Sequence, residues 1–221
     1  MADMKIEIEL LSETIFGCGE AVSNSIDIEV LQDNIGLPYM KGKTFKGKLR
    51  EEVEEIVKLI NLSTKKDFSD RVIKLFGEES SFTKDVSNVL ENLKFSNCRV
   101  SKNIKDALEE AVVNGVISKE DVLNSFTDIR SFTSIDKNGI TKKGSLRQAR
   151  VVKKSFKYYV DINTLKKLDN IDKGILCMGI SALRNIGSME SRGKGNILCK
   201  FIENNKDMTK FYIEKLEKEL N

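Results

Sequence analysis

The sequence of 221 residues predicts one α+β domain, in which helices and strands share a core. Two stretches, 4–11 and 155–162, alternate between apolar and polar residues, and this period of two indicates half-buried strands. Two other stretches, beginning near Phe45 and Leu165, carry apolar residues at helical spacing. The strand pattern and the helix pattern occur in turn along the chain, and this succession predicts the mixed fold class.

The first strand places Ile6, Ile8 and Leu10 on one side and the charged residues between them on the other. A loop rich in Gly, Ser and Asn follows at 16–25, and residues 26–31 are expected to be a short extended piece. Gly36, Leu37 and Pro38 then interrupt the chain before the first helix.

The first helix is predicted from an apolar stripe with Thr44 as its N-cap. The stripe consists of Phe45, Leu49, Val53, Ile56 and Ile60. Residues 69–77 resemble a second, short helix that ends at Gly77. Residues 78–127 are less regular, with strand-like pieces at Leu93–Phe95 and short helices at 106–113 and 119–126, so we expect an insertion there.

The second half of the chain predicts the strand at 155–162, a helix from Leu165 to Leu183, and a glycine-bearing loop at 187–195. A last strand at 196–202 and a charged helix at 208–220 complete the sequence. The order of elements fits a ferredoxin-like βαββαβ core that carries an inserted region.

Composition excludes several classes of protein. The chain has no histidine, which rules out serine–histidine triads and histidine bases. Its four cysteines form no CxxC pair, so we expect reduced thiols rather than a zinc site. No apolar run approaches the length of a membrane span, and we expect a cytoplasmic protein with no membrane partner.

The net charge is only +3, but the basic residues are segregated. Two stretches, 34–50 and 137–160, contain basic residues and no acidic residue. In the first of them Lys43, Lys46 and Arg50 share one side of the predicted helix. The start of a helix attracts anions, so this side suits a phosphate backbone. The alternative is a lysine-rich surface helix without a ligand. Gly42-Lys43-Thr44 lacks the spacing of a nucleotide-binding P-loop.

Two further features favour nucleic acid but have plain alternatives. In the second basic stretch, Phe156 and Tyr158 are expected in the core, which leaves Tyr159 as the plausible base-stacking residue. The loop 187–195 combines three glycines with Arg192 and Lys194, so its backbone could approach a ligand closely. A tight turn between a helix and a strand would use the same glycines.

Four segments in one order resemble the RAMP superfamily of CRISPR-associated proteins, and most closely the backbone subunit of type III effector complexes, with a central segment similar to that of subtype III-D. They are the stretch Gly36–Arg50 (GLPYMKGKTFKGKLR), Leu75–Gly77 (LFG), the segment from Ile129 to Val152 with its SIDKNGITKKGSLRQARVV, and Ser191–Gly195 (SRGKG). The resemblance spans almost the whole chain.

The resemblance implies a ferredoxin-like, RRM-related core with an inserted thumb, and partners that are guide RNA, target RNA, copies of the chain and other effector subunits. The expected RNA contacts are Lys41, Lys43, Lys46, Arg50, Lys142, Lys143, Arg147, Arg150, Ser191, Arg192 and Lys194.

In the type III backbone subunit an aspartate cuts target RNA with Mg²⁺ or another divalent cation, and Asp27 matches it by its position six residues before Asp33. Asp27 is thus the candidate catalytic and metal-binding residue, with Glu29 or Asp33 as possible helpers. On its residue type alone, a loop aspartate is more often a turn-former or a cap.

Two alternatives remain open from the sequence. The chain could be an RNA-binding RAMP subunit with a purely structural role in the complex. It could also be a repeat-RNA processing nuclease of the same superfamily, although such enzymes often use a histidine, which this chain lacks.

Overall fold

The computed structural model describes residues 3–17, 26–78, 92–133, 137–140, 142 and 144–220. Its main sheet contains β1 (Met4–Leu10), β2 (Leu93–Phe95), β5 (Lys157–Thr164), β6 (Ile197–Glu203) and β7 (Lys206–Asp207). The strands lie in the order β2-β5-β1-β6-β7, and all neighbours are antiparallel. Without the short β7, this is the strand order of a ferredoxin-like βαββαβ core, so the predicted α+β fold class is confirmed.

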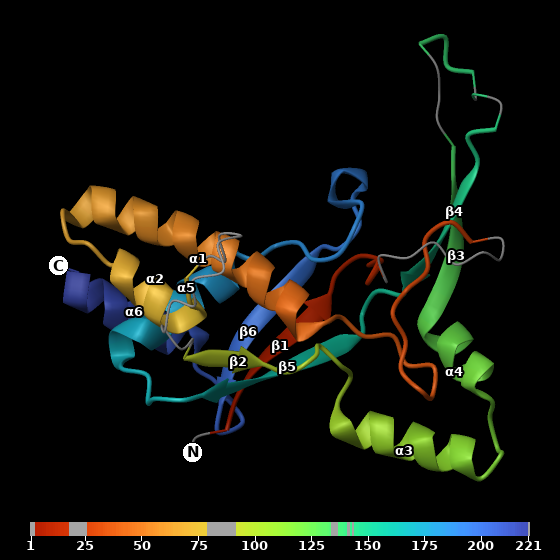
Figure 1. The fold of residues 1–221 in the computed structure, drawn as a ribbon, viewed down its shortest axis with the longest axis horizontal. Helices are drawn as coiled ribbons and strands as arrows, with labels where there is room; N and C mark the ends of the chain where they lie inside the picture. Colours follow the sequence, from red (N-terminus) through yellow and green to blue (C-terminus); the bar gives the residue numbers. More distant parts are fainter. Residues whose placement is uncertain are drawn as a thin grey trace.

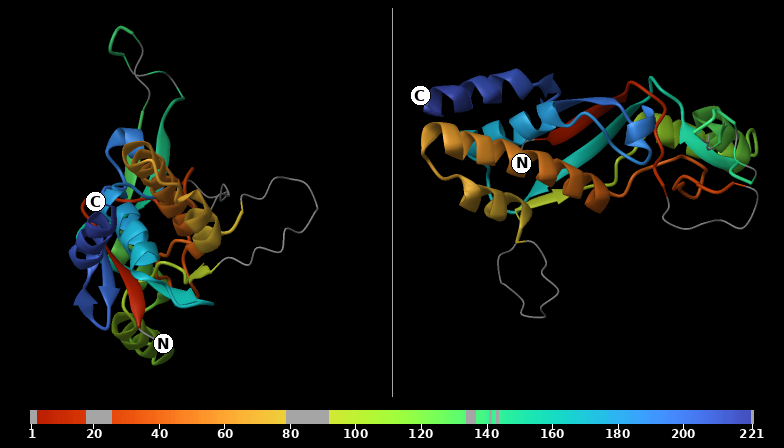
Figure 2. Two further views of the ribbon diagram at one scale, coloured as in Figure 1. Left: turned by 90° about the vertical axis from the view of Figure 1, so that its left-hand side faces the viewer. Right: turned by 90° about the horizontal axis from the view of Figure 1, so that it is seen from above.

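Four helices belong to this core: α1 (Gly42–Thr64), α2 (Ser69–Phe76), α5 (Asn170–Ala182) and α6 (Thr209–Leu220). Helix α5 packs between α1 and α6, as the view from above in Figure 2 shows. It begins later than its apolar pattern, because the side chains of Asp169 and Asp172 form a reciprocal capping box at its start.

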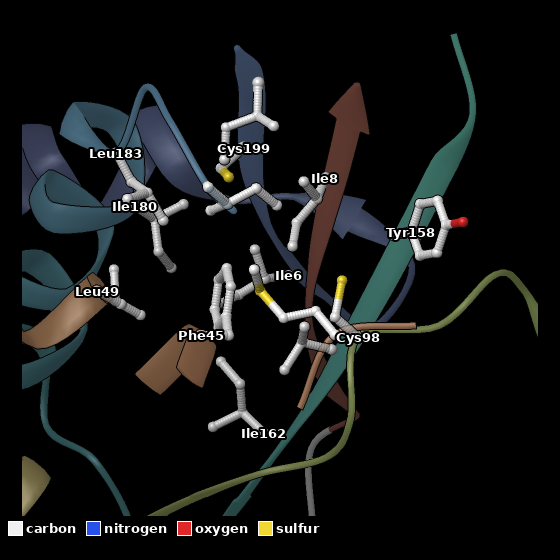
Figure 3. Packing of buried hydrophobic residues seen from close by; sticks show 14 of the residues in the cluster. Ile6, Ile8, Phe45, Leu49, Cys98, Tyr158, Ile162, Ile180, Leu183 and Cys199 are labelled. Carbon is white, nitrogen blue, oxygen red and sulfur yellow. The ribbon is translucent and has the colours of Figure 1, made fainter. Parts of the chain in front are cut away.

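The core lies between these helices and one face of the sheet. Along β1, β5 and β6, alternate residues are buried, as the period of two requires. Figure 3 shows Ile6 and Ile8 of β1 together with Phe45 and Leu49 of α1. The same figure shows that the fully buried ring of Tyr158 lies toward one end of the cluster.

Helix α1 begins three residues earlier than a Thr44 cap would give. Its N-cap is Lys41, whose side chain makes no capping bond, and the amide of Gly42 donates instead to Oδ1 of Asn97 at 3.0 Å. A Cβ atom at position 42 would lie 2.4 Å from the carbonyl oxygen of Ser96. Because Gly42 has no side chain, the first residue of the helix can pack closely against the backbone of Ser96, just after β2.

Between β2 and β5 the chain adds α3 (Lys102–Val113), α4 (Lys119–Phe126), and a hairpin of β3 (Thr127–Phe132) and β4 (Arg147–Val152). Figure 1 shows the hairpin extending away from the main sheet, at the opposite end from α2 and α6. The insertion expected at about 78–127 overlaps these elements only in part. Leu93 is fully buried and pairs with Thr164, so β2 belongs to the core.

Cys98, Cys177 and Cys199 are buried and form no disulfide, whereas Cys18 lies outside the described residues. Burial raises the pKa of Cys199 to about 12, so its thiol stays protonated at neutral pH. Over the part of the chain that the structure describes, no helix has the length and apolar character needed to cross a membrane.

Candidate nucleic-acid interface

A hollow of about 290 Å³ lies between the start of α1 and the glycine loop. Its lining is apolar at Phe16, Leu31 and Met40 and polar at Lys41, Thr44 and Ser188. The full lining consists of Ile15, Phe16, Gly17, Leu31, Met40, Lys41, Thr44, Lys48, Gly187 and Ser188. Two sequence segments that were predicted to bind the same ligand, 34–50 and 187–195, thus border one cavity.

The first turn of α1 gives this hollow a positive edge. It contains no acidic residue, and Lys41 and Lys43 are exposed there. The amide of Gly42 donates to Asn97, and those of Thr44 and Phe45 donate to the carbonyl of Lys41, so the positive charge comes from the two lysines and from the helix dipole. The edge is therefore suited to a phosphate group, as the sequence predicted.

The glycine loop contains a short 3₁₀ turn, η1 (Glu190–Arg192), and is anchored on residues 13–15. The amide of Ser188 donates to the carbonyl of Ile15, and the amide of Gly195 donates to that of Glu13. Gly187 has a φ of +88°, and a Cβ there would lie 2.4 Å from the Ile15 carbonyl oxygen. Gly187 is thus needed for the close approach of the loop to Ile15, which agrees with the alternative that the glycines form a tight turn between a helix and a strand.

The loop also links α1 to the hairpin. On one side, Nζ of Lys48 lies 3.6 Å from a carboxylate oxygen of Glu190. On the other side, the guanidinium of Arg192 lies over the ring of Phe132 in β3, 5.7 Å from its centroid. Phe132 pairs in register with Arg147 of β4. In Figure 1 the loop containing η1 accordingly lies between the start of α1 and the hairpin. The three predicted basic segments therefore lie along one continuous edge of the molecule.

Asp27 lies at the outer edge of this hairpin. Its backbone amide donates to the carbonyl of Gln148 at 2.9 Å, and its Oδ2 accepts the Gln148 amide at 2.7 Å. Its Oδ1 is 3.8 Å from Nη1 of Arg147, and 40% of its side chain is exposed. The carboxylate is thus fixed beside an exposed arginine, and within the described part of the chain its Oδ1 accepts no backbone amide.

The two carboxylates proposed as helpers for Asp27 have other partners. Glu29 accepts from Nε of Arg150 at 2.8 Å and from the Val30 amide, and its side chain is 15% exposed. Asp33 accepts the amides of Ile35 and Leu37 and pairs with Arg99 at 2.9 Å. These contacts explain the local structure: Asp33 closes the turn that leads to α1, and Glu29 holds the extended segment on β4.

The protein offers a divalent cation few ligands at this position. Among the described residues no three Asp, Glu or Cys side chains gather as a metal cluster. Among the described residues, the contact printed for Oδ1 of Asp27 is the exposed guanidinium of Arg147, at 3.8 Å. Mg²⁺ often takes one or two protein carboxylates and completes its shell with phosphate oxygens and water. Asp27 would therefore supply one ligand, and RNA would supply others.

Besides Arg147, which lies beside Asp27, three of the predicted RNA contacts are engaged in ion pairs. Nε of Arg50 lies 2.5 Å from Glu54, and Arg150, which is 11% exposed, binds Glu29. Nζ of Lys194 lies 2.5 Å from Glu13, which also accepts from Arg130. The hydrogen bonds from Arg130 and Lys194 lower the pKa of Glu13, although partial burial opposes them.

The remaining predicted contacts lie in exposed positions or near the hollow. Lys46 is half-buried on α1, and Ser191 and Arg192 are exposed in η1. Arg147 is exposed at the start of β4, and Lys142 is exposed in the connection between β3 and β4. Lys143 lies outside the described residues.

Tyr159 lies on the other face of the sheet. Its hydroxyl donates to Glu7 at 3.3 Å, and the lysines around it face carboxylates across the strands. The register pairs Lys5 with Asp161, Lys200 with Glu7, and Lys157 with Glu9. This face has balanced charge, which does not favour a polyanion. Phe156 and Tyr158, expected in the core, pack as predicted: Phe156 stacks on Phe126 and Tyr158 is fully buried.

Sequence reasoning missed Phe132 as the aromatic residue of the interface. Its ring lies close to two cations, Arg192 and Lys194, at 5.7 and 6.0 Å. The residue stands 60 positions from Arg192 in a segment without strong alternation, so no local pattern links the two. The only signal was the resemblance of the segment from Ile129 to Val152.

Comparison with known proteins agrees with this architecture. A family model described as "RAMP superfamily" matches residues 7–198. A comparison with curated proteins gives no match. A chain from a cryo-EM structure of the type III-B Cmr-beta bound to cognate target RNA is 13% identical, with a TM-score of 0.63, and the match covers 91% of this chain and 97% of that one. A chain from the apo state of type III-B Cmr-beta is 12% identical, also with a TM-score of 0.63, over 93% and 99% of the two chains.

Proposed function

The chain belongs to the RAMP superfamily, and we propose that it is an RNA-binding subunit of a type III CRISPR effector complex that cuts target RNA through Asp27. The observation that carries this proposal is the single edge formed by the start of α1, the glycine loop and the hairpin. Fold similarity to a complex solved with cognate target RNA supports it.

In this proposal the strand in the hollow is the guide RNA, held mainly by its backbone. Lys41 and Lys43 at the start of α1 contact phosphates, and Arg192 continues the contact across the glycine loop. The apolar lining at Leu31 and Met40 accommodates a sugar or base edge. Backbone contacts of this kind bind any sequence, which suits a protein whose specificity comes from a guide strand.

In this proposal Asp27 acts on the target strand that pairs with the guide. RNA carries its own nucleophile in the 2′-hydroxyl, so the protein must align it and assist the transfer of its proton. The Gln148 amide fixes the Asp27 carboxylate, and Oδ1 is left to accept a proton or to hold a cation. A divalent cation at this oxygen would neutralise charge on the scissile phosphate.

The proposed partners are guide RNA, target RNA, further copies of this chain and other effector subunits, in the cytoplasm. A purely structural RNA-binding role is the second candidate. It is favoured by the hydrogen bond from the Gln148 amide to Asp27 at 2.7 Å, because that bond would also suit a residue that only holds residues 26–30 on β4.

The substitution Asp27→Asn tests the proposal in the complex reconstituted with guide RNA. We expect the variant to bind RNA as the wild type does and to lose Mg²⁺-dependent cutting of target RNA, because the amide can neither accept the proton nor neutralise a cation. Asp161→Asn, an exposed aspartate on the opposite face of the sheet, is the matched control and should cut normally.

Two results separate the alternatives. Unchanged cutting by Asp27→Asn would leave the chain with the purely structural role. A wild-type protein that binds no RNA at low salt would refute both candidates, because both depend on the same cationic edge.

A further inference from the structure

We infer a second RNA-phosphate site on the far side of the glycine loop, in a hollow of about 570 Å³ that contains Arg130, Lys153, Lys154 and Lys194. The other lining residues are Leu11, Ser12, Glu13, Asp128 and Gly193. Four cations and two carboxylates line the hollow, which leaves a formal charge of 4 − 2 = +2. The inference rests on the proposed function and extends the path of its RNA strand.

The glycine loop separates the two hollows and contributes to both. Gly187 and Ser188, at its beginning, line the first hollow, whereas Gly193 and Lys194, near its end, line the second. Between them stand the exposed residues Ser191 and Arg192. A strand that leaves the start of α1 and crosses the loop therefore reaches a second group of cations without leaving the same edge.

Lys154 is the cation best placed to receive a ligand. It occupies the turn between β4 and β5, which is fixed on both sides: the Lys153 amide donates to Phe126, and the Ser155 amide donates to Leu10. Ser155 has a φ of +70°, which a tight turn imposes. The Lys154 side chain is exposed and has no hydrogen-bond or ion-pair partner among the described residues. Lys153, in contrast, donates to the carbonyls of Asn124 and Ser125 at the end of α4.

Arg130 and Lys194 are held ready by Glu13. Nε and Nη2 of Arg130 donate to one carboxylate oxygen at 2.8 and 2.5 Å, and Lys194 donates to the other at 2.5 Å. The Arg130 side chain remains 48% exposed, so it keeps N–H groups for a further acceptor. Glu13 thus fixes the positions of two cations and neutralises only one charge.

These features fit the phosphodiesters of a strand better than a free phosphate ion. The donors are spread along an open hollow on three separate segments of the chain, at 130, 153–154 and 194, and two of them already share a carboxylate. A small ion would find no closed set of donors. A polyanion gains from several weak contacts in sequence, because each contact releases counterions.

The test uses single-stranded RNA of graded length, from about 4 to about 16 nucleotides, and the variant Lys154→Ala. We expect short strands, which fill the first hollow alone, to bind wild type and variant equally. Above a threshold length the variant should bind several-fold more weakly, and its slope of log K against log salt should fall by about one. Lys167→Ala, an exposed lysine between β5 and α5, should show no such difference.

Several outcomes would overturn the site. No effect of Lys154→Ala at any length would show that the strand does not reach this hollow. An equal effect at all lengths would show that the hollow is not a second site reached only by longer strands. Inorganic phosphate that binds the wild type alone in a Lys154-dependent manner, and displaces long RNA more than chloride does at the same ionic strength, would assign the hollow to a small ion. If no RNA of any length bound the wild type, the proposed function itself would fail.

Discussion

Glu13 shows how a single residue can organise the proposed interface without touching the first hollow. Its carboxylate joins Arg130 of β3 to Lys194 of the glycine loop, and its carbonyl accepts the Gly195 amide. The two side-chain contacts join Glu13 to residues 117 and 181 positions away. We therefore regard Glu13 as a positioning residue for two cations of the second hollow, Arg130 and Lys194.

Acid should weaken this junction. The hydrogen bond from Arg130, with that from Lys194, lowers the pKa of Glu13 from its usual 4.5. A carboxylate whose pKa is lowered on folding contributes stability that is present above the usual pKa and is lost as pH falls through the lowered value. Thermal melting between pH 7 and pH 3 should show Glu13→Gln less stable than wild type at neutral pH and the difference shrinking below about pH 4.5. Melting curves that stay a constant distance apart across this range would contradict the assignment.

Helix α1 is the element on which the proposed RNA contact depends most. Its buried stripe fixes it on the sheet, and Gly42 brings its first turn close to the carbonyl of Ser96. The stripe could be predicted from periodicity, because Phe45, Leu49 and Val53 are all buried as expected. The cap could not, because the group that accepts the Gly42 amide belongs to Asn97, 55 residues away.

The position of charge along α1 gives a test at the same scale. Lys43 and Lys58 are both exposed on this helix, but only Lys43 lies in the first turn. Replacing Lys43 by alanine should weaken RNA binding for all sequences and lower the salt slope by about one, because one phosphate contact is lost. Lys58→Ala, the control, should bind like wild type. Fluorescence anisotropy over a salt series measures both, and equal slopes for the two variants would remove the helix start from the interface.

The strands of the hairpin could not be predicted from the local sequence pattern. The segment Thr127–Phe132 (TDIRSF) has little apolar alternation, and it becomes a strand by pairing with β4, whose partner residues lie 15 to 25 positions away. Residues 93–95 were assigned to the insertion for a similar reason, because three residues carry too little pattern to identify a core strand. In both cases the tertiary pairing, and not local propensity, determines the structure.

At the scale of the whole molecule, the fold brings basic segments that are distant in the sequence together along one edge. The basic stretches at 34–50 and 137–160 were visible in the sequence, and so was the loop at 187–195. Their adjacency follows from the ferredoxin-like strand order, which places the end of β1, the start of β6 and the start of α1 at one end of the sheet. The ion pair of Arg150 was not predictable in the same way, since Glu29 lies 121 residues from Arg150, whereas Arg50 pairs with Glu54 only four positions further along the same helix.

Ultraviolet crosslinking of the protein to single-stranded RNA, followed by mass spectrometry of the modified peptides, tests the central claim most directly. Our account predicts crosslinked peptides from all three segments, near Lys43, Arg147 and Arg192, and none from the opposite face around Tyr159. Crosslinks concentrated at Tyr159, or confined to one of the three segments, would contradict it.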